Sequence, residues 1–359
     1  MSRGEKAATL LEASGVGSLL RRVGAWRGIL VLNYHRIGRR PPWPSDVGIW
    51  STTAEEFDQQ MQFLARHFEV LSAADLLDGR ARRDGRCVMV TFDDGYRETY
   101  EVAYPILEAH GVPATYFLTT GFIDATHTPW WDEIAWMVRE SPRTELAAAG
   151  WFAAPQSLAE VDRQRTTKLL IDHYKTLPSE QAATFLDYVA RATGSGRRDP
   201  SEAVSEFITW EMARDLDRAG MGIGGHTVSH PVLARLPQAH QRREIKSCLD
   251  RLEHELAARP RLFSYPEGMT DSFDSATAAC LEENGVDFAF SNYGGLVRTS
   301  TRNPWDLPRT CLTPLTQRKF RALATLPSLF IAAERRRLLT RATTVTPRHG
   351  SSATTGAAV

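Results

Sequence analysis

The chain has 359 residues, of which 42% are hydrophobic, and its 43 lysine and arginine residues balance its 43 aspartate and glutamate residues. This length and apolar content are sufficient for one large α/β domain with a substantial core. The lack of a net charge argues against nucleic acid as a partner, because nucleic-acid binding relies on an excess of basic residues.

The first segment, 7–26, mixes leucines with Arg21 and Arg22 in an amphipathic pattern. It predicts an N-terminal amphipathic helix within residues 1–28, resting either on the domain or on a membrane surface. No secretory signal or membrane-spanning run is visible, so we expect a cytoplasmic protein, with peripheral contact to a membrane as an option.

Strand-like and helix-like segments then alternate along the chain in the manner of repeated β–α units. Strands are predicted at 29–34, 87–91, 114–118, 221–224, 262–265 and 288–291, and helices at 55–67, 98–110, 238–258 and 275–284. This alternation predicts parallel strands arranged as a barrel over residues 29–318.

The alternation breaks between about residues 125 and 205, where the chain is charged and mostly helical. We interpret this stretch as a helical insertion or lid, in which Trp130, Trp131 and Trp136 are candidates for stacking on sugar rings. A place in the core is the alternative, and the commoner one for helical aromatic clusters. A C-terminal helix is expected at 319–341, followed by a disordered tail at 342–359 that is rich in threonine, serine, glycine and alanine.

Two adjacent carboxylates, Asp93 and Asp94, follow the apolar run 87–90 and precede Gly95. In a fold of β–α units, chemistry gathers where strands end, so this pair is expected at the rim of the barrel. The alternative is a polar turn that caps the next helix, since aspartate is a common N-cap residue. Neighbouring side chains of a strand point to opposite faces, so a bend at Gly95 must bring both carboxylates into one site.

Two histidines, His226 and His230, follow an apolar segment and a pair of glycines. Two imidazoles at this spacing can converge on one ion, although a surface or core pair of histidines is the alternative. The glycines before them and Pro231 after them favour a loop at a strand end. Two nitrogens and one carboxylate would leave coordination positions open, as in a catalytic metal site.

Together with a third segment, 263–268, these two motifs resemble those of the polysaccharide deacetylases of the nodulation-protein type, carbohydrate esterase family 4. The resemblance covers the middle of the chain and implies a distorted (β/α) barrel of about seven units, here with a helical insertion. It implies that Asp93 is the catalytic base and that Asp94, His226 and His230 bind a divalent metal. Zinc is the default metal for such ligands, and cobalt, nickel and manganese are alternatives.

The chemistry implied is hydrolysis of an amide, which needs a strengthened nucleophile and stabilisation of an oxyanion. A divalent ion supplies both, and Asp93 would take the proton from the attacking water. Backbone NH groups around Glu267 would add an oxyanion donor. The residues expected to contact the substrate are Tyr96, Tyr265, Pro266, Glu267 and Trp131.

The chain lacks two residues of the family pattern, so other residues must fill their roles. Ser264 stands where many members have the arginine that orients the base, and Arg309 is our candidate to supply that charge; the alternative is an arginine solvated at a strand edge. The late Leu-x-His motif, whose histidine acts as general acid, has no histidine here. His35, at the end of the first strand, is the candidate acid, and Glu267 is a weaker rival. The alternative is that His35 only hydrogen-bonds a loop. Tyr34-His35 resembles the exopolysaccharide-modifying branch of the family.

The resulting hypothesis is a metal-dependent hydrolase that removes N-linked acetyl groups from an acetylated carbohydrate, in a glycan or a lipid-linked glycan precursor. The alternatives are an O-acetyl esterase or other non-peptide amide hydrolase of the same superfamily, and a non-catalytic carbohydrate-binding relative. Cys87, Cys248, Cys280 and Cys311 form no Cys-x-x-Cys pair, and we expect Cys87 and Cys311 to be buried strand residues in a reduced protein.

Overall fold

The computed structural model describes residues 3–24, 26–40, 48–80, 86–298, 301 and 303–331. Seven parallel strands form a closed barrel: β1 (Gly28–Tyr34), β12 (Leu307–Cys311), β11 (Phe288–Ser291), β10 (Leu262–Ser264), β9 (Gly222–Gly225), β6 (Ala114–Leu118) and β5 (Arg86–Phe92), which pairs again with β1. A short strand, β4 (Glu69–Val70), extends the sheet from β5. The predicted distorted barrel of about seven units is confirmed.

The register of the strands decides which residues meet at the rim. In the pairing of β1 with β5, Tyr34 lies opposite Phe92, so the residues that follow, His35 and Asp93, leave the barrel at the same level. In the same way Leu118 of β6 lies opposite Gly225 of β9, immediately before His226. Because all seven strands are parallel, their carboxyl ends open onto one face of the barrel.

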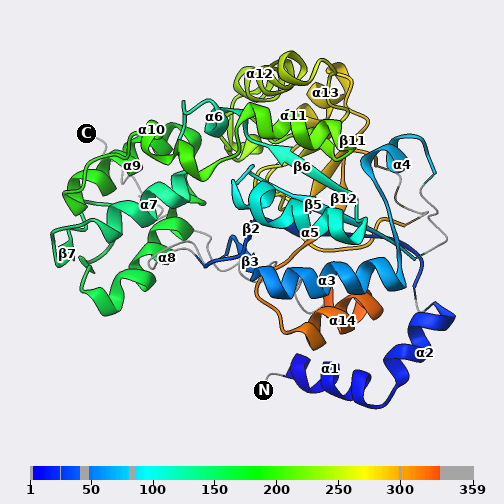
Figure 1. Ribbon diagram of the computed structural model, residues 1–359. Coiled ribbons are helices and arrows are strands. Elements are labelled where there is room, and N and C mark those ends of the chain that lie inside the picture. The colour runs from blue at the N-terminus through cyan, green and yellow to red at the C-terminus, as the bar shows by residue number, and fades with distance from the viewer. Residues whose placement is uncertain are drawn as a thin grey trace, which may run out of the picture.

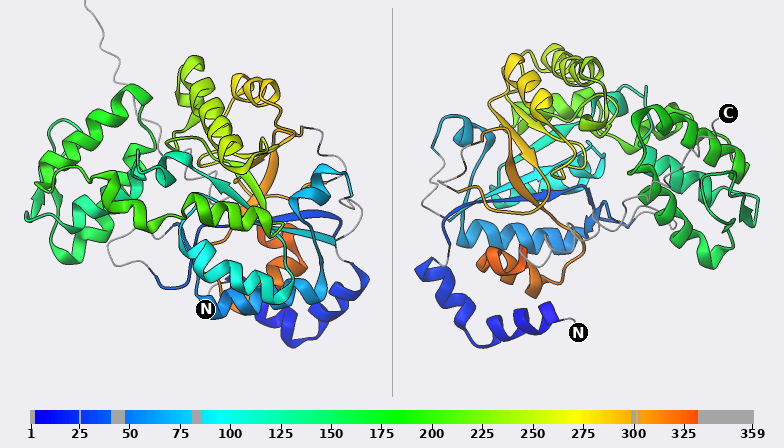
Figure 2. Two further views of the ribbon diagram at one scale, coloured as in Figure 1. Left: turned by 45° about the horizontal axis from the view of Figure 1, so that its top comes forward. Right: turned by 180° about the vertical axis from the view of Figure 1, so that it is seen from behind.

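Helices surround the barrel (Figures 1 and 2). They are α3 (Ala54–His67), α4 (Ala73–Leu77), α5 (Tyr104–His110), α11 (Trp210–Arg218), α12 (Gln238–Leu256), α13 (Ser275–Glu283) and α14 (Gln317–Thr325). The start of α3 is fixed by a capping box, in which Thr53 and Glu56 each accept a hydrogen bond from the other's backbone NH. The predicted helix 98–110 instead begins with a π-helical turn, η1 (Thr99–Ala103), which leads into α5.

The helical insertion lies between β6 and β9 and projects to one side of the barrel (Figure 1). It contains α6 (Thr120–Ile123), α7 (Trp130–Arg139), the hairpin of β7 (Glu145–Leu146) and β8 (Gln156–Ser157), α8 (Arg163–Tyr174), α9 (Ser179–Thr193) and α10 (Pro200–Ala203). Its apolar residues form a cluster of their own around Met137, Leu170 and Phe185. The insertion can therefore hold its shape beside the barrel.

The two ends of the chain differ from the prediction in detail. The expected single N-terminal helix is two helices, α1 (Arg3–Ala13) and α2 (Val16–Val23), because Gly15 between them is left-handed, with φ of 72°. Both contact α14. The C-terminal helix was expected at 319–341. In the structure α14 ends at Thr325, and residues 327–331 are helical again. Residues 332–341 and the expected tail lie outside the described residues.

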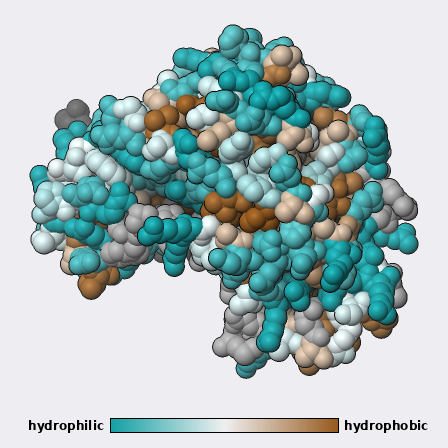
Figure 3. All heavy atoms as spheres, in the orientation of Figure 1, coloured by the Kyte–Doolittle hydropathy of each residue, from teal (hydrophilic) through white to brown (hydrophobic). Residues whose placement is uncertain are grey.

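The surface is mostly hydrophilic in the view of Figure 3, where apolar side chains form small separate patches. Among the described residues, no helix has both the length and the apolar character to cross a membrane. No disulfide joins the four cysteines, all of which lie in the described residues, and Cys87 is buried as predicted. Cys311 is only half-buried, contrary to the prediction, because it is the last residue of β12 and reaches the open face of the barrel.

Candidate active site

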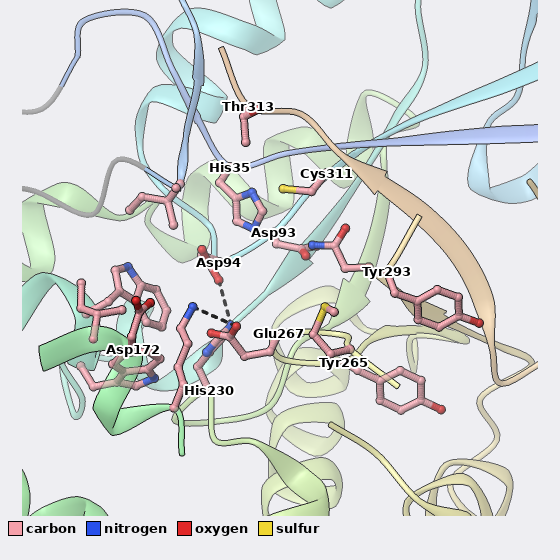
Figure 4. A pocket seen from close by; sticks show the side chains of 18 of the residues that line it. His35, Asp93, Asp94, Asp172, His230, Tyr265, Glu267, Tyr293, Cys311 and Thr313 are labelled. Carbon is pink, nitrogen blue, oxygen red and sulfur yellow. Dashed lines mark ion pairs between the residues drawn. The ribbon is translucent and has the colours of Figure 1, made fainter. Parts of the chain in front are cut away.

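A cavity of about 390 Å³ lies at the carboxyl ends of the strands, between the barrel and the insertion. Residues that directly follow or end β1, β5, β9, β10, β11 and β12 line it, among them His35, Asp93, His226, Tyr265, Asn292 and Cys311. Figure 4 shows several of these side chains converging from the barrel, with Asp172 of α8 on the opposite side. Its size is typical of a small-molecule or sugar site.

Asp94, His226 and His230 form one buried cluster in this cavity. One ligand atom from each residue lies within 4.8 Å of the other two. Asp94 Oδ1 is 3.5 Å from His226 Nε2 and 3.5 Å from His230 Nε2. The three residues predicted as metal ligands are thus brought together from two distant parts of the chain.

The backbone at Asp94 explains how two neighbouring carboxylates reach one site. Asp94 is left-handed, with φ of 73°, and Gly95 follows with φ of 86°. The bend predicted at Gly95 therefore begins one residue earlier. A left-handed conformation is uncommon for a residue with a side chain and costs about 1 kcal/mol or more, so the surrounding structure must hold Asp94 in place.

The two histidines are oriented by different neighbours. His226 Nδ1 is 2.7 Å from the carbonyl oxygen of Ser264, which accepts a hydrogen bond and so leaves the proton on Nδ1 and the lone pair on Nε2, facing Asp94. The ring of His230 packs 4.6 Å from that of Trp131. Burial lowers the pKa of His230 to about 4, against the opposing effect of Asp94, so its imidazole is neutral at neutral pH.

The donor set and its burial fit a divalent cation. Asp94 Oδ1 is buried and has no hydrogen-bond partner among the described residues, although it faces two imidazole nitrogens. Two imidazoles and a carboxylate suit zinc, cobalt, nickel or manganese, and three protein ligands leave positions for water and substrate. Asp94, His226 and His230 are the residues that would hold such an ion.

Asp93 lies beside this cluster, with Oδ2 at 3.9 Å from His226 Nε2. Its carboxylate accepts two parallel hydrogen bonds from Arg309, at 2.8 Å to Oδ1 and 2.7 Å to Oδ2. Asn33 donates a third, at 3.0 Å. Burial alone would raise the pKa of Asp93, but Arg309 and His226 outweigh burial and hold that pKa well below its usual range.

Arg309 is fully buried inside the barrel, which excludes the alternative of an arginine solvated at a strand edge. It was expected after the last strand, yet it lies within β12, a strand that the apolar pattern did not reveal because Pro308 and polar residues interrupt it. Its Nη2 also donates to Ser264 Oγ, at 2.7 Å. The serine that replaces the family's arginine is therefore a partner of the arginine that reaches the same carboxylate from another strand.

His35 lines the cavity on the other side of Asp94 from His230 (Figure 4). Its backbone NH donates to Ser51 Oγ, at 3.1 Å, which fixes the chain where β1 ends. Burial alone would lower the pKa of His35, but a hydrogen bond with Cys311 and the charges of Asp94 and Asp93 raise it to about 9. His35 therefore carries a proton at neutral pH.

Three of the five predicted substrate contacts, Tyr265, Glu267 and Trp131, line the cavity. Tyr96 and Pro266 are not among the lining residues. Tyr96 is fully buried, and its hydroxyl donates to Asp132, at 2.6 Å, and accepts from Trp131 Nε1, at 2.9 Å. It supports the wall of the cavity without lining it, because the left-handed turn at Asp94 and Gly95 places it against Asp132 and Trp131 of the insertion.

The Glu267 carboxylate is paired with Lys175, which follows α8, at 3.0 Å. Burial would raise the pKa of Glu267, but the Lys175 ammonium lowers it below its usual range. Glu267 is left-handed, with φ of 60°. The sequence did not predict that the insertion reaches this loop, since nothing in the local pattern around Lys175 indicates a distant partner.

Comparison with known proteins assigns the middle of the chain to a protein family. The family model described as polysaccharide deacetylase matches residues 80–289. A poly-β-1,6-N-acetyl-D-glucosamine N-deacetylase of Staphylococcus epidermidis is 31% identical over 110 residues, which are 27% of this chain and 38% of that protein. The enzyme of the same name from Staphylococcus aureus is 30% identical over 106 residues, 26% of this chain and 37% of that protein. The match thus spans less than two fifths of these curated relatives.

Solved structures share the fold. The deacetylase PplD of Streptococcus pyogenes superposes with a TM-score of 0.54 at 18% identity, covering 83% of this chain and 98% of that one. IcaB of Ammonifex degensii superposes with a TM-score of 0.52 at 18% identity, covering 84% of this chain and 98% of that one. At this level of identity the likeness establishes the architecture.

Proposed function

Since this chain belongs to the polysaccharide deacetylase family, as its three motifs indicated, we propose that it hydrolyses the N-acetyl groups of an acetylated polysaccharide. Poly-β-1,6-N-acetylglucosamine is the first candidate substrate, because curated relatives carry its name. The observation that carries the proposal is the buried cluster of Asp94, His226 and His230 directly beside the Asp93–Arg309 pair.

We assign the metal site to Asp94, His226 and His230. A divalent cation bound there supplies a water of lowered pKa and polarises the acyl oxygen. The lowered pKa of Asp93 keeps this carboxylate ionised at neutral pH, so it is free to accept a proton, and a metal-bound water of lowered pKa would release one more readily. Arg309 keeps Asp93 ionised and fixes its plane through two hydrogen bonds.

His35 is our candidate for the general acid. The amine leaves only after it receives a proton, and a histidine whose pKa is raised to about 9 holds that proton at neutral pH. It lines the same cavity as Asp93 and Asp94, so it replaces the late histidine that the chain lacks. The backbone NH groups of the left-handed loop at Glu267 remain the candidate oxyanion donors.

The test is acetate release from poly-β-1,6-N-acetylglucosamine by the purified protein after treatment with a chelator and after return of zinc, cobalt, nickel or manganese. We expect release to stop with the chelator and to resume with at least one of the four metals. The proposal fails if the metal-loaded protein releases no acetate from any N-acetylated glycan. An O-acetylated glycan assayed alongside separates the proposed amidase from the esterase alternative.

A lipid-linked glycan precursor is a second candidate substrate, favoured by one surface feature. Leu10 of α1 and Leu19 of α2 are 71% and 59% exposed, and Val16 lies between them. Exposed leucines beside Lys6 and Arg22 suit contact with an anionic lipid surface. Co-sedimentation with anionic vesicles, lost in a Leu10→Ser/Leu19→Ser variant, would support a substrate held at a membrane; equal sedimentation of both proteins would reject it.

A further inference from the structure

One wall of the cavity belongs to the insertion and not to the barrel. Six residues of α8 and its C-terminal end line it: Gln164, Thr167, Lys168, Ile171, Asp172 and Lys175. Consecutive residues of this set are alternately three positions and one position apart, which places them on a single face of the helix. The insertion therefore presents a continuous helical surface to whatever occupies the cavity beside Asp93 and Asp94.

The charged residues of this wall already have partners. Lys168 pairs with Asp172 at 2.5 Å, and Lys175 pairs with Glu267 at 3.0 Å. Each cation thus faces an anion, which leaves little net charge for attracting an ionic ligand. A neutral ligand suits this wall better than a phosphate or a carboxylate.

Among the uncharged polar groups that line the cavity without such a partner, one lies on the insertion and another on the barrel. Thr167 is fully buried, and its Oγ has no hydrogen-bond partner among the described residues. On the barrel side, Asn292, which follows β11, has a buried Oδ1 that is likewise unpaired within the described part of the chain. Leaving a buried polar group unpaired is costly, so such groups in a cavity wall indicate a ligand that completes them.

We propose that Thr167 and Asn292 are specificity-determining residues that hydrogen-bond hydroxyl groups of the sugar on either side of the reacting acetamide. The threonine hydroxyl both donates and accepts, and the asparagine oxygen accepts, which matches sugar hydroxyls. This inference rests on the proposed deacetylase function and divides its substrate recognition between the insertion and the barrel. A site built to pair with hydroxyls discriminates strongly against ligands that lack them.

The chain offers a matched control one residue away. Thr166 is also a buried threonine of α8, but its hydroxyl donates to the carbonyl of Ser157 within the insertion, at 2.7 Å, and it does not line the cavity. Thr166→Val and Thr167→Val remove the same hydroxyl from the same helix while keeping the side-chain shape. Only the second variant changes a residue that lines the cavity and removes a hydroxyl without a partner among the described residues.

The experiment measures KM and kcat for acetate release from an N-acetylglucosamine oligomer, together with calorimetric binding of that oligomer to each variant. We expect Thr167→Val to raise KM and Kd about tenfold with little change in kcat, and Thr167→Ser to restore both. Thr166→Val should lower the melting temperature and leave KM unchanged. Asn292→Ala, which keeps its backbone hydrogen bond to Gly268, should raise KM in the same way as Thr167→Val.

The inference is overturned if Thr167→Val and Asn292→Ala bind the oligomer as the wild type does, or if Thr166→Val raises KM equally. Should Thr167→Val fail to fold, Asn292→Ala alone decides between the two results. A wild-type protein with no metal-dependent acetate release would instead reject the proposed function. A wild type that is active while both variants keep its KM rejects only the role of Thr167 and Asn292.

Discussion

Arg309 of β12 reaches the carboxylate of Asp93 inside the barrel and binds both of its oxygens, at 2.8 and 2.7 Å. A buried ion pair is stable only when its other hydrogen-bonding groups are also satisfied. Here the remaining donors of Arg309 are used by the Ser291 carbonyl, Asn33 and Ser264. The candidate base is therefore held rigidly, and its orientation depends on a residue 216 positions away in the chain.

Replacing Arg309 tests this dependence. We expect Arg309→Met to destabilise the fold by about 3–5 kcal/mol, because it leaves a buried carboxylate without its counter-ion. The pKa of Asp93 should rise in this variant, since burial then acts on it with less opposition. Urea unfolding at neutral pH measures the loss, and Asp93→Asn/Arg309→Met should recover part of it. A loss below about 1 kcal/mol would contradict a structural role for the pair.

Asp93 and Asp94 are neighbours with different predicted roles, which substitution should separate. Asp94→Asn removes the carboxylate that faces both imidazoles, so we expect the bound metal to fall sharply in metal analysis. Asp93→Asn should keep the metal and lose turnover by at least about 100-fold, the usual effect of removing a general base. Equal loss of metal from both variants would show that Asp93 is a ligand as well.

The sequence was informative where function depends on adjacent residues. Asp93 with Asp94 and His226 with His230 could be found because each pair stands directly after a strand, and the parallel barrel brings strand ends together. Arg309 could be proposed only through the serine at position 264. Its strand was missed because Pro308 and Thr310 break the apolar run. The position of Arg309 in the barrel therefore became clear only from the pairing of β12 with β1 and β11 in the structure.

The wall formed by α8 was out of reach of sequence reasoning for a different reason. Thr167 lies in a charged helix, and Lys175 directly follows it; the pattern of this helix predicts only that one face is covered. Which cavity that face borders depends on how the insertion packs against the barrel, through contacts such as Lys175 with Glu267. Tyr96 shows the reverse case, since it stands two residues from Asp94 and yet supports the insertion.

The pH dependence of turnover should identify the general acid. Since the proposed general acid, His35, would act in its protonated form, kcat should fall as pH rises through its pKa of about 9. A cation held by Asp94 repels the imidazolium, so this limb should lie at lower pH in the metal-loaded enzyme than the value of about 9. We expect His35→Gln to lower kcat and to remove the alkaline limb. If His35→Gln keeps both the rate and the limb, another group is the acid.

The lowered pKa of His230 predicts that the fold of the metal-free protein is sensitive to acid. Its pKa is lowered to about 4 from an ordinary 6.5, so the unfolded chain takes up the proton first as pH falls. The stability that depends on neutral His230 is present above about pH 6.5 and is lost between 6.5 and 4, amounting to about 3 kcal/mol. Thermal melts of wild type and His230→Gln across this range measure the difference, which should vanish if His230 is not buried as a neutral group.

The Lys175–Glu267 pair is the contact through which the insertion acts on the motif loop. The pair is partly exposed, so Lys175→Met should lower the free energy of unfolding by less than about 1 kcal/mol. Its effect on kcat should be larger, because Glu267 is left-handed and its loop carries the candidate oxyanion donors. Lys168→Met, which breaks a pair within α8 that does not touch this loop, is the matched comparison for stability. A fall in kcat for Lys175→Met with both melting temperatures close to that of the wild type would show that the insertion positions the loop; an unchanged kcat would show that the barrel alone holds it.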